Sequence, residues 1–309
     1  MEILDTFLRD IANETSGFGL GEPQRPGSES IVAIVPITRQ VQQERDYITL
    51  NEAGDRVSIQ DTGNIDEVIV SNNSDRPIFI PAAWMLGGQT QARVVAQSIV
   101  VLPGETRNIS VVCVQENRAI SPGVTLTPGN VAPRSVEQRL YPYGRTRGDT
   151  CQNEVWDTVR EYGEKVLPTE EADNLMDAHG RHIRATETVI SQLPEVPDQV
   201  GFAILVPKGV GSLECFDLPD SWRVIGRSLI EKEVEVLSQK REDFVSVFEY
   251  KPHKAHSILR AFLQRPFVVE TVVSGPNWET VGISASDYAG EVTIMDSNII
   301  HVSLGRKEY

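Results

Sequence analysis

This chain of 309 residues has few of the features that mark secreted, membrane-spanning or zinc-binding proteins. Its three cysteines, Cys113, Cys151 and Cys215, include no C-x-x-C pair, which excludes a disulfide framework and a cysteine-based zinc site. No apolar run approaches the roughly 18 residues that a membrane-spanning helix requires. The N-terminal MEILDTFLRDIANE is acidic and amphipathic, unlike a secretory signal. We therefore expect a reduced, cytoplasmic protein with no membrane partner.

Positive charge is also scarce. The chain has 44 acidic and 29 basic residues and a formal charge of −15. Because such a surface repels phosphate backbones at long range, we expect no nucleic-acid partner. The apolar fraction of 40% and the charged fraction of 24% are ordinary for globular proteins and argue against a disordered chain.

The common catalytic motifs are missing as well. The sequence contains no G-x-S-x-G, no P-loop and no H-E-x-x-H. The first half shows no alternation of strands with helices, which disfavours a parallel dinucleotide-binding sheet. No cofactor and no metal are therefore expected, and the sequence leaves open whether the chain is an enzyme.

The hydrophobic pattern predicts an α+β protein with mainly antiparallel sheets. A short amphipathic helix at 2–13 precedes many short strands between 31 and 115, typical of an antiparallel sandwich or open barrel. A turn signal at 52–55 predicts a hairpin, and proline and glycine predict surface loop over 119–150. Helices are predicted at about 151–166, 170–193, 221–237 and 253–263, and strands at 201–206, 213–216, 268–273, 279–284, 291–295 and 299–304.

This pattern divides the chain into three parts. We expect a β-rich domain over 1–125, a helical connector over 126–199 and an α+β half over 200–309.

Polar side chains and glycine are concentrated over 78–118. The adjacent Gly87 and Gly88 allow a left-handed backbone and close approach to a ligand. Gln89, Gln91 and Arg93 alternate, so in a strand they would share one face. Such a face can bind a carboxylate, a phosphate or a sugar hydroxyl. The alternative is a tight turn whose solvated strand face contacts a second subunit.

Cysteine and histidine offer weaker candidates for chemistry. Cys113 lies among valines, where a thiol is usually an inert buried group. Two H-x-x-H pairs would each project from one side of a helix, and they are His179/His182 and His253/His256. A metal site would need these pairs to meet, and the alternative is surface histidine. His301 lies in a predicted strand, where a hydrogen bond to backbone is the alternative to a functional role.

Several segments together resemble a known family. Gly87, Gly88, Gln89 and Arg93 are followed about 20 residues later by VVCVQ (111–115) and Arg118. GFAILVPKGVGSLECF (201–216) and IIHVSL (299–304) are similar to a strand-turn-strand and a closing strand of that family. The family is named for its association with ADP-ribosylglycohydrolases and rhodanese-phosphatases, and the resemblance covers 75–118 and 200–304. The sequence departs from it at Gln115 and Ala119, where members tend to have Glu and Trp.

The resemblance implies an intracellular protein associated with ADP-ribose or nucleotide metabolism. We therefore expect a binding module for a small anionic ligand that is nucleotide- or ADP-ribose-like. The expected binding residues are Gly87, Gly88, Gln89, Gln91, Arg93, Arg118 and His301. The first alternative is a structural or assembly protein whose Gly-Gly hairpin forms a homo-oligomer interface. The second is a hydrolase that uses His301 or the histidine pairs.

Overall fold

The computed structural model describes residues 2–27, 30–116, 119–141, 149–166, 174–239 and 252–307. The chain forms two compact units. Unit 1 combines residues 1–45 with 186–309, and unit 2 is the continuous segment 46–185. The expected α+β class is confirmed. The units group segments that pack together, and the three-part division expected from the sequence stays a prediction.

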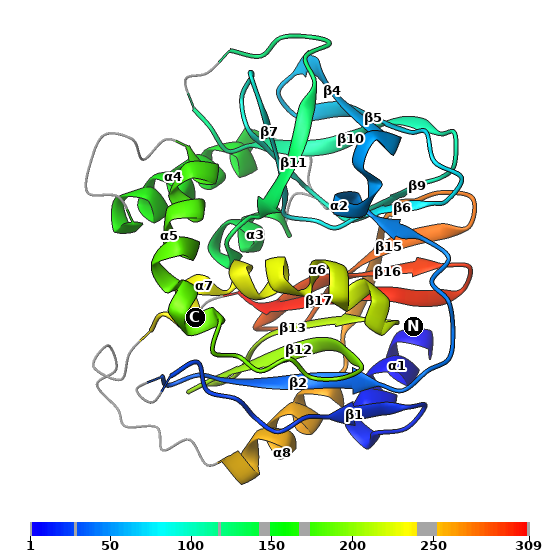
Figure 1. Ribbon diagram of the computed structural model, residues 1–309, viewed down its shortest axis with the longest axis vertical. Coiled ribbons are helices and arrows are strands. Elements are labelled where there is room, and N and C mark those ends of the chain that lie inside the picture. Colours follow the sequence, from blue (N-terminus) through cyan, green and yellow to red (C-terminus); the bar gives the residue numbers. More distant parts are fainter. Residues whose placement is uncertain are drawn as a thin grey trace. The chain divides into compact units, whose positions relative to one another are not determined.

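Unit 1 is built on one antiparallel sheet, to which the described residues contribute eight strands in the order β1-β2-β12-β13-β17-β16-β15-β14 (Figure 1). Because β2 pairs with β12, the two ends of the chain share this sheet. The strands are β1 (Phe18–Leu20), β2 (Ala33–Arg39), β12 (Gln199–Val206), β13 (Gly209–Phe216), β14 (Val268–Ser274), β15 (Trp278–Ser284), β16 (Tyr288–Met295) and β17 (Asn298–Arg306).

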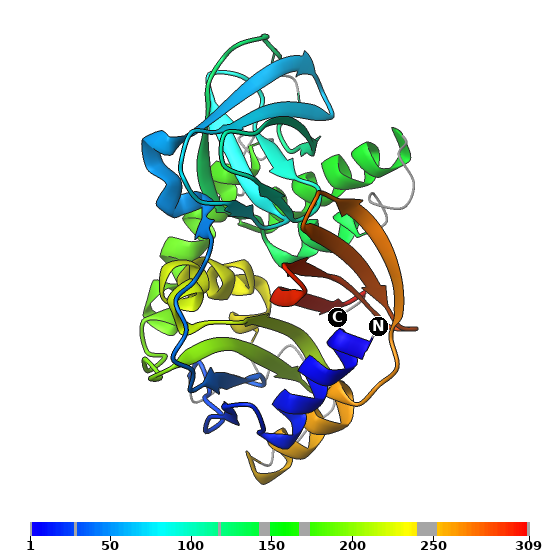
Figure 2. The same cartoon turned by 90° about the vertical axis from the view of Figure 1, so that its right-hand side faces the viewer.

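Helices pack on both faces of this sheet. α1 (Glu2–Asn13) and α8 (Pro252–Leu263) lie side by side (Figure 2) and bury Leu8 and Leu259 in one apolar core with Val35. α6 (Pro219–Lys232) contacts β12 and β13 and is followed by α7 (Val234–Leu237). The rings of Phe202 and Trp222 meet edge to face at 5.7 Å, which anchors α6 on the opposite face from α1. The helices predicted at 2–13, 221–237 and 253–263 are confirmed.

Unit 2 contains a curled antiparallel sheet whose described strands follow the order β11-β7-β8-β10-β5-β4. Its two edges meet, because Gln60 and Thr125 form a β-bridge and the Asp61 N–H donates to the Val124 carbonyl at 2.9 Å. The expected antiparallel sandwich or open barrel is confirmed. The strands are β4 (Val57–Asn64), β5 (Glu67–Asn72), β7 (Trp84–Gly88), β8 (Arg93–Val95), β10 (Thr106–Cys113) and β11 (Leu126–Val131).

The interior of this barrel is apolar along most of its length. Cross-strand partners share a face of a sheet, and the pairs Val68 with Ile109 and Val95 with Val111 are fully buried or nearly so. One end differs, because Cys113 pairs with Arg93 there and Asp61 is buried next to them. A polar cluster of Asp61, Arg93 and Cys113 therefore replaces the apolar core at that end.

Smaller elements complete unit 2. β3 (Ile48–Thr49), β6 (Ile78–Ile80) and β9 (Ile99–Val101) form a separate three-stranded sheet among the described residues. The short helices α2 (Leu50–Ala53) and η1 (Gly54–Arg56) connect β3 to β4. The longer helices are α3 (Arg134–Leu140), α4 (Asp149–Val166) and α5 (Leu175–Ile190). No helix in the described ranges is long and apolar enough to cross a membrane.

Two local predictions in unit 2 are wrong. The expected hairpin at 52–55 does not form, because Thr49 and Glu52 make a capping box that starts α2. β3 then pairs in parallel with β6, and β4 pairs with β5. The loop expected over 119–150 contains β11 and α3, since β7 supplies hydrogen-bond partners that local composition does not reveal. Residues 142–148 lie outside the described ranges.

Candidate functional site

A cavity of about 200 Å³ in unit 2 is partly open to the surface. It lies between β7, β11 and the first turn of α5, and the segment after β10 closes it. A β-bridge between Gln115 and Asn174 holds that segment against the start of α5. The lining residues are Gly87, Gly88, Ala92, Gln115, Thr127, Asn174, Met176 and Asp177.

Two expected residues, Gly87 and Gly88, form one wall of this cavity. Neither has the left-handed backbone that the sequence suggested, because both continue strand β7. Their role is to leave space. A Cβ on Gly87 would lie 2.6 Å from the sulfur of Met176, and one on Gly88 would lie 2.9 Å from the carbonyl oxygen of Thr125.

The start of α5 forms the polar wall. Asn174 caps the helix, because its side-chain oxygen accepts the N–H of Met176 at 3.1 Å. Its amide donates to Asp177 at 2.8 Å. A carboxylate in a first helical turn is stabilised by the helix dipole. Asp177 therefore brings negative charge to the cavity, and no cationic side chain is among the described lining residues.

Gln115 connects the cavity with the barrel interior. Its side-chain oxygen accepts the N–H of Ala92 at 3.3 Å, and its backbone carbonyl accepts the thiol of Cys113 at 3.2 Å. The Cys113 backbone is held from the other side by the amide of Gln152 on α4, with contacts of 3.0 and 2.8 Å. The cavity wall and the buried thiol therefore share one hydrogen-bonded segment.

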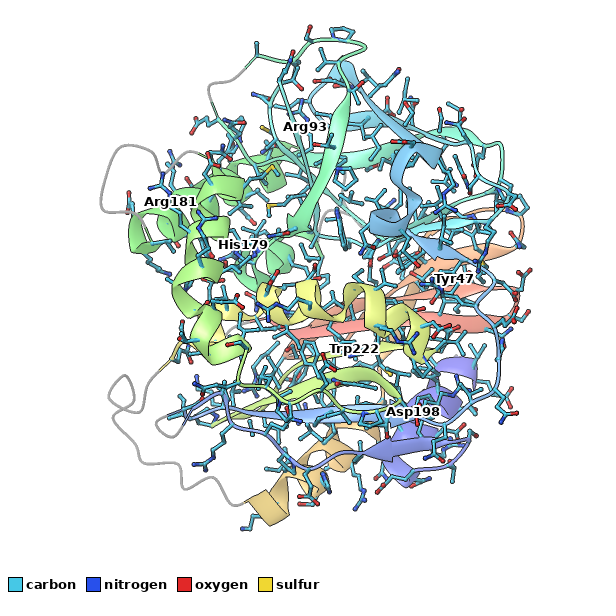
Figure 3. All side chains as sticks on the ribbon, in the orientation of Figure 1. Tyr47, Arg93, His179, Arg181, Asp198 and Trp222 are labelled. Carbon is cyan, nitrogen blue, oxygen red and sulfur yellow. The ribbon has the colours of Figure 1, made fainter. Side chains whose placement is uncertain are left out.

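Arg93, labelled in Figure 3, is fully buried inside the barrel. It is not among the residues that line the cavity. Its side chain is fully buried, and Nη1 donates to the backbone oxygen and to the side-chain oxygen of Gln91 at 3.1 and 3.0 Å. Nη2 is 3.8 Å from Oδ2 of Asp61. Burial lowers the pKa of Arg93, and the neighbouring Cys113 and Asp61 partly oppose that shift.

The remaining expected residues are dispersed. Gln89 is exposed in a bend between β7 and β8, so it does not share a strand face with Gln91 and Arg93. Arg118 lies outside the described residues. His301 is on β17 in unit 1.

His301 belongs to a buried polar cluster of Glu214, Lys232, His301 and Ser303. Glu214 is fully buried on β13 and its two oxygens contact the other three side chains. His301 Nε2 lies 3.1 Å from Oε2, and the hydroxyl of Ser303 donates to Oε1 at 2.8 Å. Lys232 at the end of α6 forms an ion pair with the same carboxylate. The ring of Phe216 stacks on the imidazole with centroids 4.4 Å apart.

The two histidine pairs lie in different units, and the described histidines each contact a group of their own unit. His179 and His182 on α5 each place Nδ1 against the hydroxyl of Tyr162, at 2.9 and 2.8 Å. His256 Nε2 contacts the Gly21 carbonyl at 2.9 Å, and the side chain of His253 lies outside the description. Within the described ranges, no group of three or more His, Cys, Asp or Glu could hold a metal ion.

Sequence reasoning missed the far wall of the cavity. Thr127, Asn174 and Asp177 come from β11 and α5, far along the chain from Gly87. An Asn three residues before an Asp at a helix start was the available signal. The helix predicted at 170–193 placed its start earlier in the chain, in residues that lie outside the described ranges.

The fold and the cavity define an α+β protein with a site large enough for one small polar group. The chain belongs to the family described as the ARG and Rhodanese-Phosphatase-superfamily-associated Protein domain, whose model matches residues 19–304. The family resemblance noted in the sequence is thereby confirmed. No curated protein and no solved structure matches the chain.

Proposed function

We propose that this chain is a binding module for a small nucleoside- or ribose-like ligand, held in the cavity beside Gly87 and Gly88. The observation that carries the proposal is the set of Gln115, Asn174 and Asp177 around one cavity. Few polar groups in a concave site, next to exposed backbone, are typical of small-molecule sites. At about 200 Å³ the cavity is below the roughly 300–1,000 Å³ of drug-sized sites and suits one ring.

The charge of the lining selects the part of the ligand that enters. Asp177 and the side-chain oxygens of Gln115 and Asn174 accept hydrogen bonds, so they favour the hydroxyls of a ribose or the amino group of a base. A phosphate would be repelled by Asp177. The anionic part of the nucleotide-like ligand expected from the sequence would then remain outside the cavity. The family description, with its association with ARG and rhodanese-phosphatase proteins, supports a ligand of this class.

Thermal melting with three probes tests the proposal. ADP-ribose and adenosine at millimolar concentration should raise Tm, because a ligand that binds the native state stabilises it, and pyrophosphate should not. Asp177→Asn should weaken binding about tenfold or more, since a hydrogen bond to a charged group is lost. Asp55→Asn, at an exposed position in η1, is the matched control and should bind normally. If none of the three probes changes the Tm of the protein, the proposal is refuted.

Sedimentation velocity on the same samples separates ligand binding from assembly. If the exposed Gln89 mediates a homo-oligomer contact, Gln89→Ala will lower the sedimentation coefficient without any effect of ADP-ribose. If the cavity is the functional feature, Gln89→Ala will leave the sedimentation coefficient unchanged. We propose a cytoplasmic location as well, which the free thiols of Cys113 and Cys215 support.

A further inference from the structure

The guanidinium of Arg93 has one edge without a hydrogen-bond acceptor. Nη1 is bonded to Gln91, but Nε and Nη2 find no acceptor in good geometry among the described residues. These two nitrogens lie on the same side of the planar group and form the fork that usually binds an oxyanion with two parallel hydrogen bonds. A fully buried side chain therefore presents an open two-donor edge inside the barrel.

Such an arrangement is costly unless the edge acquires an acceptor. Removing a cation from water without full hydrogen bonding destabilises a protein by several kcal/mol per charge. Asp61 does not meet the need, because its nearest oxygen is 3.8 Å from Nη2. Its carboxylate already accepts the N–H of Gly63 at 2.8 Å and that of Ser121 at 3.4 Å.

Cys113 is the direct cross-strand partner of Arg93, and the two side chains interact electrostatically inside the barrel. Its thiol donates to the carbonyl of Gln115, whose side chain lines the cavity. Gln115 therefore borders the cavity with its side chain and the Cys113 sulfur with its carbonyl.

We propose that Cys113 is a peroxide-sensitive thiol whose oxidised form, a sulfenate, is held by the open edge of Arg93. The Cys113 sulfur attacks one oxygen of hydrogen peroxide, an S–O bond forms and the O–O bond breaks. Sulfur loses two electrons, the peroxide is reduced, and the departing oxygen leaves as water with the thiol proton. The sulfenic acid then releases its proton to solvent. Its oxygen accepts hydrogen bonds from Nε and Nη2.

The chain contains its own control in Cys215. Both thiols are free and fully buried on strands. Cys215 packs in the apolar core of unit 1 and donates to the Phe216 carbonyl at 3.4 Å. Burial raises the pKa of Cys215 well above its usual value. Cys215 also has a guanidinium nearby, that of Arg39, but Arg39 donates to the carbonyls of Ser16 and Asp217. Burial alone therefore predicts equal resistance of the two thiols to oxidation, and the open donor edge of Arg93 is what distinguishes Cys113.

The test uses the full chain with Cys151→Ser, so that only the two buried thiols report. Hydrogen peroxide is added under native conditions, and the reaction is quenched in denaturant containing dimedone, which traps sulfenic acid without requiring access in the fold. Peptide mass mapping should find Cys113 oxidised at least tenfold faster than Cys215. In urea, which unfolds the chain, the oxidation rates of Cys113 and Cys215 should become equal. If Cys113 and Cys215 are oxidised at similar rates in the folded protein, the proposal is overturned.

Substitution of the arginine isolates its contribution. Arg93→Met should lower Cys113 oxidation to the Cys215 rate, whereas Arg107→Met, a partly exposed arginine on the same barrel, should leave it unchanged. If Arg93→Met retains the full Cys113 rate, the role of the guanidinium is refuted. If Arg93→Met does not fold, the ratio of Cys113 to Cys215 oxidation rates in the folded Cys151→Ser protein still tests the proposal. The oxidation is measured without ADP-ribose or adenosine, which keeps this test separate from that of ligand binding.

Discussion

At the scale of single residues, Lys232 is the clearest determinant of stability in unit 1. Its ammonium and the Glu214 carboxylate are both almost fully buried. Lys232→Met should lower the free energy of unfolding by about 3–5 kcal/mol, because the buried Glu214 carboxylate loses the cation that is paired with it. Arg223→Met removes the exposed pair with Asp220 on the same helix and should cost less than about 1 kcal/mol. Urea unfolding of both variants measures the difference, and equal losses would contradict the buried role.

His179 makes the stability of the protein depend on pH. Burial, and secondly the nearby His182, lower its pKa from 6.5 to about 3 in the folded protein. Because the unfolded chain binds the proton more readily, stability is complete above pH 6.5 and falls as pH drops toward 3, by roughly 1.4 kcal/mol per unit at most.

Urea unfolding at pH 7.5, 6 and 5 should show this slope in the natural chain. His179→Asn should show a shallower slope over the same interval, because asparagine does not titrate there. Parallel slopes for the two proteins would mean that His179 is accessible to protons in the fold.

The residues of the site illustrate what the sequence could and could not reveal. Gly87 and Gly88 were recognised by composition, and both line the cavity. Arg93 was predicted to face a ligand because it alternates with Gln91, but alternation does not distinguish the outside of a barrel from its inside. Asp61, the buried carboxylate that explains its orientation, lies three strands away in the sheet order, beyond the reach of local patterns.

At the scale of elements, strand β7 sets the shape of the cavity through its two terminal glycines. Gly88→Ala should destabilise the protein by about 1–3 kcal/mol, because the new Cβ meets the Thr125 backbone oxygen at 2.9 Å. Gly87→Ala should cost less, since it meets only the flexible side chain of Met176, yet it should narrow the cavity and weaken adenosine binding.

Thermal melting with and without adenosine separates these two effects. Gly87→Ala combined with Met176→Ala should restore binding, because the thioether no longer occupies the space. Equal destabilisation by both glycine substitutions would contradict the structural explanation.

Elements with strong periodicity were predictable, and those defined by distant partners were not. α1 and α8 follow from apolar spacing alone. β11 contains Pro128 and Gly129 within a segment read as loop, but its pairing with β7 makes it a strand. The turn signal at 52–55 marks a change of chain direction before β4, but the capping box of Thr49 and Glu52 makes this segment a short helix and not a hairpin turn.

At the scale of the whole molecule, unit 2 is one continuous segment of the chain, whereas unit 1 combines two separate segments. Unit 2 is continuous, so residues 46–190, which include all of α5, should fold alone and unfold cooperatively in urea. Residues 186–309 lack β2 and α1, which supply a strand and part of the core of unit 1. That fragment should show no cooperative transition, and circular dichroism with urea titration tests both. A cooperative transition in the second fragment would show that β2 is dispensable.

The pairing of β2 with β12 also fixes an order of events during translation. β2 leaves the ribosome early, but its partner is not synthesised until all of unit 2 has followed. The nascent apolar segment 33–37 must therefore stay unpaired while the barrel forms, and it is exposed to chaperones and to other chains during that interval. The slowest step in the folding of this protein should be the docking of β2 onto β12, which must wait for both strands to be synthesised.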